Sequence, residues 1–339
     1  MKKIIPVIAS LLIMLTSCAE RYTSHSFFAM DTFITVDALD ANADILKELE
    51  ALVYEDERMY SRTFSQSSLY EFNKSGDNSH LSDATAELLE FSSAMHTNTD
   101  GAFSPYMGAL TDLWNIKSET PQVPEDSGIK ETLIHCNPEN LIISDIGISK
   151  TDPLMILDLG GIAKGKSAQN CIEFLKSEGV ENAVISFGGS IACIGHSAKS
   201  DIGWSIGIKN PFNTSQVIGT VTTTDSYIAV SGAYERCFEK DGKRYHHILD
   251  PQTGYPAETD IESTVVISKD GAVSDGLSTA LFVMGKDKAL EFYKKGIYDF
   301  EAVLILKDGS ITVTDGLKDS FSFDVTADYK DGNNLVYIK

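Results

Sequence analysis

A carboxylate and a hydroxyl that could bind a metal ion lie in the segment Ser274–Leu281 (SDGLSTAL). If this segment is helical, Asp275 and Thr279 stand at positions i and i+4 and project from one face of the helix. Carboxylate and hydroxyl oxygens are the hard ligands that Mg²⁺ prefers. The pattern is compatible with a Mg²⁺ site, although a Ser-Asp pair at the start of a helix is more commonly a cap.

A second segment, Gly160–Ser167 (GGIAKGKS), satisfies the phosphate-loop pattern G-x-x-x-x-G-K-[ST]. Glycines let backbone N–H groups approach a phosphate, and the N-terminus of a following helix favours an anion. Three features oppose a nucleoside triphosphatase. The match lies in mid-chain, no later apolar strand ends in an obvious Mg²⁺-binding Asp, and the chain begins with an export signal. We therefore expect a glycine-rich phosphate cradle without the P-loop fold.

Two adjacent histidines, His246 and His247, lie in Val230–Ala257 (VSGAYERCFEKDGKRYHHILDPQTGYPA). Neighbouring residues of a strand point to opposite faces, so the two side chains cannot easily serve one site. One interpretation is a structural histidine beside an exposed one. The other is that one of them is a general base, because the imidazole accepts protons near neutral pH.

The elements that must position these residues are short and of mixed type. Helical spacing of apolar residues predicts helices over Ala41–Tyr60, over Ser82–Met95, after the glycine-rich segment, and from near Ser274. The expected strands are Phe27–Val36, Leu154–Leu159, Ala183–Phe187, several over 204–230, and Thr264–Ser268. Residues 118–130 are expected to form a surface loop, and 301–338 hairpins with turns at Asp308-Gly309 and Asp315-Gly316.

The overall composition is that of a globular protein. The chain has 339 residues, of which 42% are hydrophobic and 23% charged, and it contains no internal repeat or low-complexity linker. Helices alternate with strands of both the parallel type and the hairpin type along its length. The predicted fold class is α+β, in a single domain with two lobes.

Residues 1–18 (MKKIIPVIASLLIMLTSC) have the pattern of an export signal. Two lysines precede an apolar stretch, Ile4–Leu15, which is shorter than the roughly 20 residues that a helix needs to span a bilayer. The stretch ends in Leu15-Thr16-Ser17-Cys18, which resembles the lipobox of bacterial lipoproteins, where the Cys is lipidated and becomes the new N-terminus. An ordinary cleaved signal peptide with an incidental Cys is the alternative.

The domain plan that follows has three parts: a lipoprotein signal peptide over 1–17, a tether over 18–26 and a globular domain over 27–339. It places the mature protein in the cell envelope, exported and anchored by lipid to the outer face of the cytoplasmic membrane or on the periplasmic side. Acyl chains rather than charge would hold it at an anionic membrane.

The charge balance excludes nucleic acid as a partner. The chain has 49 acidic and 28 basic side chains and a formal net charge of −21, whereas binding to nucleic acid depends on cations that neutralise phosphates. The cysteines after Cys18 show no CxxC spacing, and we expect them to be small buried hydrophobic residues. They are Cys136, Cys171, Cys193 and Cys237.

Taken together, these segments resemble the bacterial FAD:protein FMN transferases, the ApbE family. The likeness begins at Ala29-Met30-Asp31-Thr32 and extends over nearly the whole mature chain. It is densest in six motifs that occur in the family's order. They are YSRTFSQSSLYEFN (60–73), GAFSPYMGALTDLW (101–114), DLGGIAKGKSAQ (158–169), ISFGGS (185–190), SGAYERCFEKDGKRYHHILDPQTGYPA (231–257) and SDGLSTALFVMG (274–285).

The resemblance implies a T-fold-like, two-lobed domain and a definite reaction. FMN would be transferred from FAD to a Thr or Ser hydroxyl of a target protein, leaving a phosphoester-linked flavoprotein and AMP. Mg²⁺ would neutralise the pyrophosphate and the charge that develops on the transferred phosphorus. The glycine-rich segment would line the flavin nucleotide and the metal, which resolves the phosphate-loop match.

The family pattern also assigns residues. The metal would bind Asp275, the Thr279 hydroxyl and backbone carbonyls near Gly161 and Ser278. His247 would be the base for the incoming hydroxyl, with Asp275 as the second catalytic residue, and Lys243 could contact a phosphate. The expected contacts of the flavin nucleotide are Met30, Ser61, Arg62, Thr63, Ala102, Phe103, Ser104, Asp158, Lys164 and Arg236. Ala233, Thr63 and Ser104 depart from residues that are common in the family at these positions.

The same resemblance implies FAD as substrate and flavin-acceptor domains of membrane electron-transfer proteins as partners, of the Rnf or sodium-pumping quinone reductase type. Two other activities fit the same residues. One is an FAD pyrophosphatase that releases FMN and AMP with water as nucleophile. The other is a flavin-binding lipoprotein without catalysis, which an intact set of Asp275, Thr279 and His247 argues against.

Overall fold

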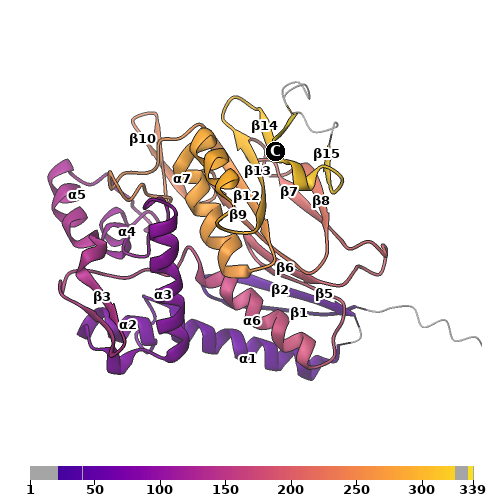
Figure 1. Ribbon diagram of the computed structural model, residues 1–339, viewed down its shortest axis with the longest axis horizontal. Helices are drawn as coiled ribbons and strands as arrows, with labels where there is room; N and C mark the ends of the chain where they lie inside the picture. The colour runs from indigo at the N-terminus through magenta and orange to yellow at the C-terminus, as the bar shows by residue number, and fades with distance from the viewer. Residues whose placement is uncertain (1–21, 40, 325–334, 339) are drawn as a thin grey trace, which may run out of the picture.

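The computed structural model describes residues 22–39, 41–324 and 335–338. The predicted signal peptide, Cys18 and the tether up to residue 21 lie outside these ranges. The largest sheet has nine strands (Figure 1). In spatial order they are β1 (Tyr22–Ala29), β2 (Thr32–Leu39), β5 (Ala183–Phe187), β6 (Ser190–Ile194), β9 (Ser226–Gly232), β12 (Ile261–Ser268), β13 (Phe300–Leu306), β14 (Ile311–Thr314) and β16 (Leu335–Ile338).

Neighbouring strands of this sheet are antiparallel, except for the parallel pair β14–β16. A three-stranded sheet has the order β15 (Phe321–Phe323), β8 (Val217–Thr223) and β7 (Trp204–Lys209). Two hairpins complete the strands: β3 (Leu141–Ser144) with β4 (Gly147–Lys150), and β10 (Cys237–Lys240) with β11 (Lys243–His246).

The helices are α1 (Ala43–Tyr60), α2 (Ser68–Ser75), α3 (Asp83–Asn98), α4 (Gly108–Trp114), α5 (Asp126–Leu133), α6 (Ala163–Ser177) and α7 (Gly271–Lys295). Short 3₁₀ turns lie at Asn78–His80, Ile134–Cys136, Pro138–Asn140 and Asp315–Leu317. The N-caps of α1, α3 and α7 are Asn42, Ser82 and Asp270, whose side chains accept backbone N–H groups of the first turn. None of the helices in the described part of the chain is long and apolar enough to cross a membrane.

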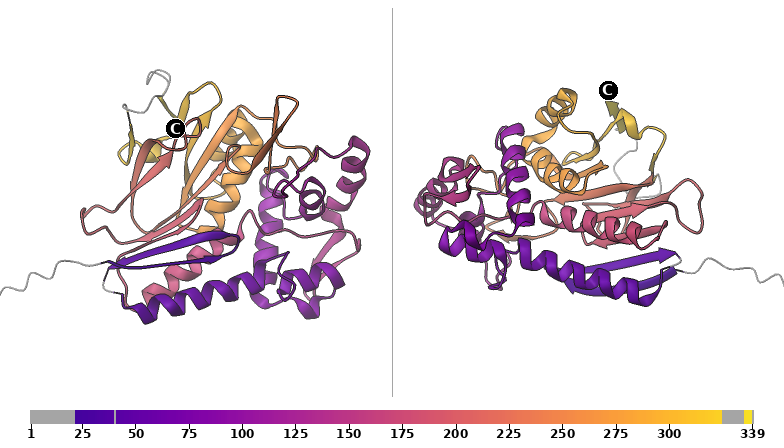
Figure 2. Two further views of the ribbon diagram at one scale, coloured as in Figure 1. Left: turned by 180° about the vertical axis from the view of Figure 1, so that it is seen from behind. Right: turned by 60° about the horizontal axis from the view of Figure 1, so that its bottom comes forward.

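The nine-stranded sheet is covered on both faces. Helices α1 and α6 pack on one face, where Ile34 and Ile185 of the sheet meet Leu49 and Ile172 of the helices in one buried cluster. The other face of the central strands packs against the three-stranded sheet in a cluster that includes Val265. Figure 2 shows these layers from two further directions. The sheet is thus a rigid support from which loops at one end can hold a site.

A second lobe, built from α2, α3, α4, α5 and the β3–β4 hairpin, lies beside the sheet (Figure 1). Its buried residues, among them Phe72 and Leu89, form one continuous cluster with Leu281 and Phe282 of α7. Helix α7 therefore joins the two lobes. The α+β fold class and the helices over 41–60 and 82–95 are confirmed, as is the strand over 183–187.

The first predicted strand is wrong, because Phe27–Val36 contains a turn. Met30 and Asp31 both have positive φ, 49° and 62°, and they connect β1 to β2 in a hairpin of eight paired residues on each strand. Two consecutive residues with positive φ fit the right-handed twist of a hairpin, but they are uncommon for residues other than Gly, Asn and Asp. The strand also starts at Tyr22, so residues 22–26 belong to the sheet and not to a tether.

The predicted strand at Leu154–Leu159 is also wrong. This segment is extended without a strand partner, and its backbone bonds to a side chain and to a loop. The Leu157 N–H donates to the Asn73 side chain, which donates in turn to the Leu157 carbonyl, and the Asp158 N–H donates to the Pro105 carbonyl. Met155, Leu157 and Leu159 are buried while Leu154 is exposed, so the hydrophobic pattern from Met155 onward reflects burial and not strand pairing.

Three boundaries differ from the predictions. Residues 118–130 are not all loop, because α5 begins at Asp126. The last long helix begins at Gly271, with Asp270 as its cap, so Ser274-Asp275 is not the cap. The Asp308-Gly309 turn does connect β13 to β14, whereas Asp315-Gly316 lies in a 3₁₀ turn that leads to another sheet.

Candidate active site

The carboxylate of Asp275 lies where α6 crosses α7. Its Oδ2 accepts the backbone N–H of Gly165 at 2.9 Å, and its Oδ1 accepts the Ser190 hydroxyl at 3.2 Å. The residue is only 5% exposed. The helices can approach this closely because a Cβ on Gly165 would lie 2.0 Å from the carbonyl oxygen of Gly271. Gly165 is thus required for close helix packing and for holding the carboxylate.

Lys164 adds a positive charge beside this carboxylate. Its Nζ lies 3.9 Å from Asp275 Oδ2 and 3.1 Å from the carbonyl oxygen of Gly160, to which it donates. The ammonium group therefore stands between the glycine segment and Asp275, where a phosphate bound at the start of α6 would meet it. This arrangement agrees with the expected nucleotide contact of Lys164.

Ser167, the last residue of the phosphate-loop pattern, contacts a buried carboxylate in α1 and not the surroundings of Asp275. The hydroxyl of Ser167 donates to the buried carboxylate of Asp56 in α1 at 2.6 Å, and Asn170 donates to the same group at 2.9 Å. Burial raises the pKa of Asp56, and these two donors oppose that effect. Ser167 therefore fastens α6 to α1 and faces away from Asp275, which explains why the pattern occurs outside a P-loop fold.

Two of the residues predicted to hold a metal, Ser278 and Thr279, meet at a third hydroxyl. The hydroxyl of Ser231, at the end of β9, lies 2.8 Å from Ser278 Oγ and 3.3 Å from Thr279 Oγ1. Ser278 Oγ donates to the Asp275 carbonyl, and a Cβ on Gly161 would lie 3.7 Å from Thr279 Oγ1. Ser231 thus links Ser278 to Thr279 beside Gly161, and the sequence reasoning had not assigned Ser231 to the site.

This set of donors fits Mg²⁺ bound together with a substrate phosphate. The described residues contain no group of three His, Cys, Asp or Glu side chains that could hold a metal, as a site for zinc would require. One carboxylate with neutral oxygen donors is instead typical of Mg²⁺, which keeps waters and takes further oxygens from phosphates. Asp275 accepts one hydrogen bond at each oxygen, and a carboxylate has room for more.

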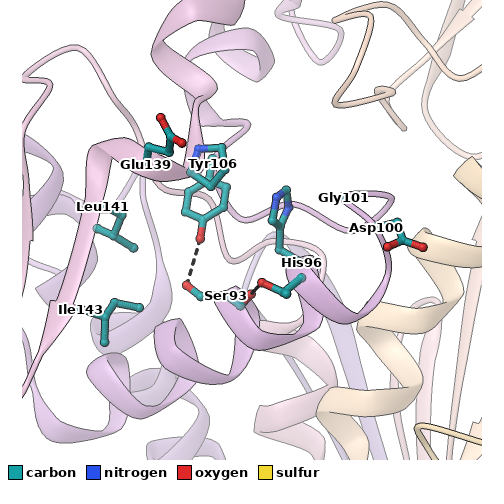
Figure 3. A pocket seen from close by; sticks show the side chains of 10 residues that line it. Ser93, His96, Asp100, Gly101, Tyr106, Glu139, Leu141 and Ile143 are labelled. Atoms are coloured by element: carbon teal, nitrogen blue, oxygen red, sulfur yellow. Dashed lines mark hydrogen bonds between the residues drawn. The ribbon is translucent and has the colours of Figure 1, made fainter.

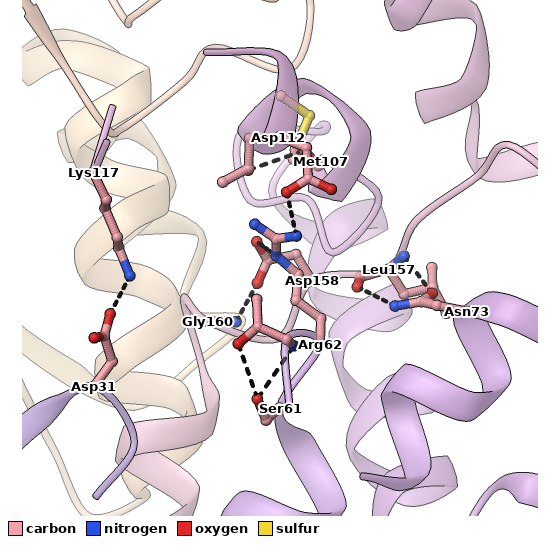
Figure 4. Close-up of polar contacts among 12 residues, drawn as sticks. Asp31, Ser61, Arg62, Asn73, Met107, Asp112, Lys117, Leu157, Asp158 and Gly160 are labelled. Carbon is pink, nitrogen blue, oxygen red and sulfur yellow. Dashed lines mark hydrogen bonds and ion pairs between the residues drawn. The ribbon is translucent and has the colours of Figure 1, made fainter. Parts of the chain in front are cut away.

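Arg62 connects two further parts of the site. Its Nε donates to Asp158 Oδ2 at 2.8 Å, and its Nη1 to Asp112 Oδ1 at 2.7 Å. The other oxygen of Asp158 accepts the N–H of Gly160 at 2.8 Å. Figure 4 shows this chain of contacts from the second lobe to the glycine segment. The structure thereby brings together the predicted contacts Arg62 and Asp158, and Asp112 is a partner that sequence reasoning missed.

The hairpin turn at Met30 and Asp31 forms another side of the site. The Met30 N–H donates to Glu57 of α1 at 2.9 Å. Asp31 binds Lys117 (Figure 4), and Arg236 Nη1 lies 3.5 Å from the same Asp31 carboxylate. Because Lys117 comes from the segment after α4, Asp31 connects the sheet to the second lobe.

Two hydrogen bonds with side chains near the end of α3 hold the backbone of the segment Ala102–Ser104 at Phe103. The Phe103 N–H donates to Thr99 Oγ1 at 3.1 Å, and the Phe103 carbonyl accepts from His96 Nδ1 at 2.9 Å. Phe103 is 2% exposed, and its ring meets the glycine segment, since a Cβ on Gly161 would lie 3.4 Å from it. The side chain therefore packs in the core, and any contact of this segment with flavin depends on its neighbours and backbone.

Ser61 and Thr63 lie at the end of α1, next to Arg62. The Ser61 hydroxyl accepts the N–H of Phe64 at 3.1 Å and lies 3.3 Å from Thr63 Oγ1. These contacts fix the turn that presents Arg62. Lys243, in contrast, binds Glu258 at the exposed β10–β11 hairpin, which gives it a surface ion pair.

The two histidines lie in different environments, His246 as the last residue of β11 and His247 directly after that strand. His246 is 6% exposed, its Nε2 lies 3.2 Å from the Ala257 carbonyl, and its ring meets Phe282 edge-on. It is a structural residue. His247 Nδ1 lies 3.3 Å from the Arg236 carbonyl, and since a carbonyl only accepts, Nδ1 carries the proton and Nε2 is left as an acceptor.

The pKa of His247 is low in the protein without substrate. Burial lowers it to about 3, and the positive charges of Arg236 and Lys164 act in the same direction. A nearby pyrophosphate would oppose these charges and raise the pKa of His247. The residue is thus neutral when substrate arrives and becomes a better proton acceptor in the complex.

A cavity of about 550 Å³ is bordered by Gly101 and Tyr106, close to the Ala102–Ser104 segment in the chain (Figure 3). It is lined by Ser93 and His96 of α3, by Tyr106, and by Glu139 and Leu141. Neither Lys164 nor Asp275 borders it. With carboxylates and no Lys or Arg in its lining, it does not suit a pyrophosphate, in contrast to the surroundings of Lys164 and Asp275.

Of the cysteines, Cys136, Cys171 and Cys193 are buried as expected, and burial raises the pKa of Cys136 to about 11. Cys237 is exposed on β10, which corrects the expectation for that residue. None of the four contributes to the site described above.

A mixed α/β domain in which a glycine segment, a lysine and one carboxylate meet at a helix crossing is suited to bind a nucleotide phosphate. A model of the ApbE family matches residues 30–304, and the chain belongs to that family. It is 32% identical over 291 residues to the FAD:protein FMN transferase of Treponema pallidum, covering 81% of this chain and 80% of that protein. It is 35% identical over 239 residues to one from Klebsiella pneumoniae, covering 70% and 73%.

Solved structures agree with this assignment. The flavin transferase ApbE from Vibrio cholerae superimposes with a TM-score of 0.80 at 27% identity, covering 89% of this chain and 99% of that one. The ApbE protein from Thermotoga maritima gives a TM-score of 0.78 at 31% identity, covering 88% and 98%. The recognition as an ApbE-type flavin transferase, an enzyme that transfers FMN from FAD to a protein, is thereby confirmed.

Proposed function

We propose that this chain transfers FMN from FAD to a Thr or Ser hydroxyl of an acceptor protein, with Mg²⁺ bound at Asp275, Thr279 and the carbonyls of Gly161 and Ser278. The observation that carries the proposal is the convergence of Asp275 and Lys164 on the glycine segment at the start of α6. Bound there, Mg²⁺ would neutralise the pyrophosphate and stabilise the negative charge of the departing AMP.

The chain's own residues account for the remaining steps. Lys164 holds the pyrophosphate at the start of α6, and the acceptor hydroxyl approaches its FMN phosphorus. The new O–P bond forms as the bond from this phosphorus to the AMP oxygen breaks, and AMP leaves with that oxygen. The hydroxyl proton passes to Nε2 of His247, whose Nδ1–H is held by the Arg236 carbonyl.

The test uses the mature protein with FAD, Mg²⁺ and the flavin-carrier domain of an Rnf-type subunit. Covalent FMN on the carrier and an equal amount of AMP support the proposal, and a carrier whose acceptor Thr is replaced by Val is the control. AMP with free FMN and no labelled carrier would show a pyrophosphatase instead. FAD that stays intact after long incubation would show flavin binding without catalysis.

A His247→Gln variant tests the base. Transfer should fall by on the order of 100-fold, while FAD affinity should change much less, because the role proposed for the side chain is to accept the proton of the acceptor hydroxyl. Transfer at the wild-type rate would remove His247 from the mechanism. Sodium-pumping quinone reductase carriers are the second class of acceptor to assay.

We also propose that the protein is exported and anchored to the membrane through Cys18, which lies outside the described residues. The support is the sequence of residues 1–18. Labelling of growing cells with a fatty-acid probe should mark the wild type and not a Cys18→Ala variant. Equal labelling of both would favour the ordinary signal peptide.

A further inference from the structure

An exposed aromatic pair lies at the tip of the β1–β2 hairpin. Phe28 and Phe33 are direct cross-strand partners whose rings meet edge-to-face, with centroids 5.3 Å apart. They are 55% and 73% exposed. Cross-strand pairing explains why the rings touch each other and stabilise the hairpin. It does not explain why two large aromatic side chains remain in solvent beside an enzymatic site.

The pair lies next to the hairpin turn that is connected to His247 through Arg236. Phe28 and Phe33 flank the turn that contains Asp31, and Arg236 Nη1 lies 3.5 Å from the Asp31 carboxylate. The backbone carbonyl of Arg236 in turn accepts both the N–H and the Nδ1–H of His247. A short series of contacts thus leads from the aromatic pair to the proposed base.

We propose that Phe28 and Phe33 dock the acceptor protein, by contacting apolar side chains next to its acceptor hydroxyl. The inference rests on the proposed function, since a transferase needs a second surface for its protein substrate. The two side chains face outward from the sheet, while Ala29 and Ile34 beside them are buried, and we expect them to take no part in FAD binding. Removal of the pair should therefore weaken acceptor binding alone.

The size of the patch favours a transient protein substrate. At these exposures, the two rings together offer on the order of 250 Å², whereas a stable interface buries about 800 Å² on each partner. The patch is therefore too small to hold a permanent second copy of the chain. A few aromatic side chains can nevertheless carry most of the binding energy of a substrate contact.

The surroundings of the patch argue against a membrane contact. The same outward face of the hairpin continues with Ser26 and Thr35, and the charged Asp31 lies at the tip. Tyr22, where the lipid anchor would join the domain, is about 20 Å from Phe28 at the usual rise per residue. An inserting surface would be apolar over a larger area.

The experiment compares the wild type with a Phe28→Thr, Phe33→Thr double variant, because Thr preserves strand propensity while removing the rings. With the Rnf-type carrier domain as probe, the KM for carrier should rise about tenfold or more, and the Kd for FAD should stay within about twofold. The matched control is Ile202→Ala. Ile202 is 77% exposed on the loop that follows the last residue of β6, whereas Ser190, which contacts Asp275, is the first residue of that strand. The Ile202→Ala variant should change neither the KM for carrier nor the Kd for FAD.

Each result has a definite meaning. An unchanged KM for carrier in a folded, active double variant overturns the inference. A wild type that binds FAD but transfers no FMN to the carrier overturns the proposed function. That result differs from an unchanged KM for carrier, which overturns the docking proposal alone. Loss of binding to lipid vesicles with an unchanged KM would assign the pair to a membrane, and dissociation of a wild-type dimer with an unchanged KM would assign it to a second copy.

Discussion

The carboxylate of Asp275 accepts the backbone N–H of Gly165 at 2.9 Å, although 110 residues separate them in the chain. This hydrogen bond holds the start of α6, where the nucleotide is expected, against the helix that carries the proposed metal ligands. A change at either residue therefore affects both parts of the site.

Replacing Asp275 by Asn should abolish Mg²⁺-dependent transfer without unfolding the protein. Asn has the same shape and can accept the Gly165 N–H, but it has no charge for the metal. We expect transfer to fall by at least about 100-fold, with a melting temperature close to that of the wild type. Titration of Mg²⁺ by calorimetry in the presence of FAD measures the lost binding directly.

Ser278→Ala is the matched control, because it removes a hydroxyl on the same helix and retains the proposed carbonyl ligand. It should keep transfer within a few-fold of the wild type. If the Asp275→Asn variant keeps its Mg²⁺ dependence, or if Ser278→Ala is the more damaging change, the metal assignment is wrong.

Replacing Gly165 by Ala should destabilise the domain. The added Cβ would lie 2.0 Å from the Gly271 carbonyl oxygen and 2.6 Å from the Asp275 Cβ, so the helices must separate. Overpacking of this kind costs about 3 kcal/mol, which urea unfolding would detect. Gly128→Ala provides the comparison, since Gly128 lies in α5 with nothing within 4 Å of an added Cβ, and it should add about 0.5–1 kcal/mol of stability.

Replacing Arg62 by Lys should weaken FAD binding. The guanidinium reaches Asp158 and Asp112 at once, whereas an ammonium group cannot reproduce this planar fork. Asp158 would then lose its fixed position beside Gly160. We expect the Kd for FAD to rise about tenfold, measured by quenching of flavin fluorescence. An unchanged Kd would show that this ion-paired chain is structural only.

The stability of the domain should fall as the pH is lowered from about 6.5 towards 4. Burial lowers the pKa of His246 to about 4, so the unfolded chain takes up a proton in this range while the folded chain does not. Such a shift removes up to about 3 kcal/mol of stability on acidification. His246→Gln should reduce the slope of unfolding free energy against pH between 4 and 6.5. An unchanged slope would place the proton uptake on other groups.

The sequence alone was sufficient to predict the elements with a strong local signal. The apolar spacing of 41–60, the Ser82 cap and the alternating strand at 183–187 depend on neighbours within a few residues, and all three are confirmed. The ordered motifs were equally sufficient to recognise the ApbE family. These features are encoded locally, so no knowledge of the three-dimensional arrangement was needed.

The errors occur where distant partners decide the conformation. Leu154–Leu159 is as apolar as a strand, but Asn73 and Pro105 take the hydrogen bonds that a sheet would provide. The turn within Phe27–Val36 was not predicted, because Met30, which has a positive φ there, is not a residue type that commonly adopts one.

The sequence by itself thus determined the fold class, the family and the residues Asp275, Thr279, Lys164 and His247 as candidates for the chemistry. Only the tertiary structure decided that Ser167 faces Asp56 and not a phosphate, and that Ser231 belongs with Thr279. It also showed that Phe28 and Phe33 form an exposed cross-strand pair beside the turn that contains Asp31. The physical reason is that the contacts of Ser167 and Ser231 join helices and strands that are far apart in the chain. Hydrogen bonds and close packing of this kind leave no pattern in the local sequence.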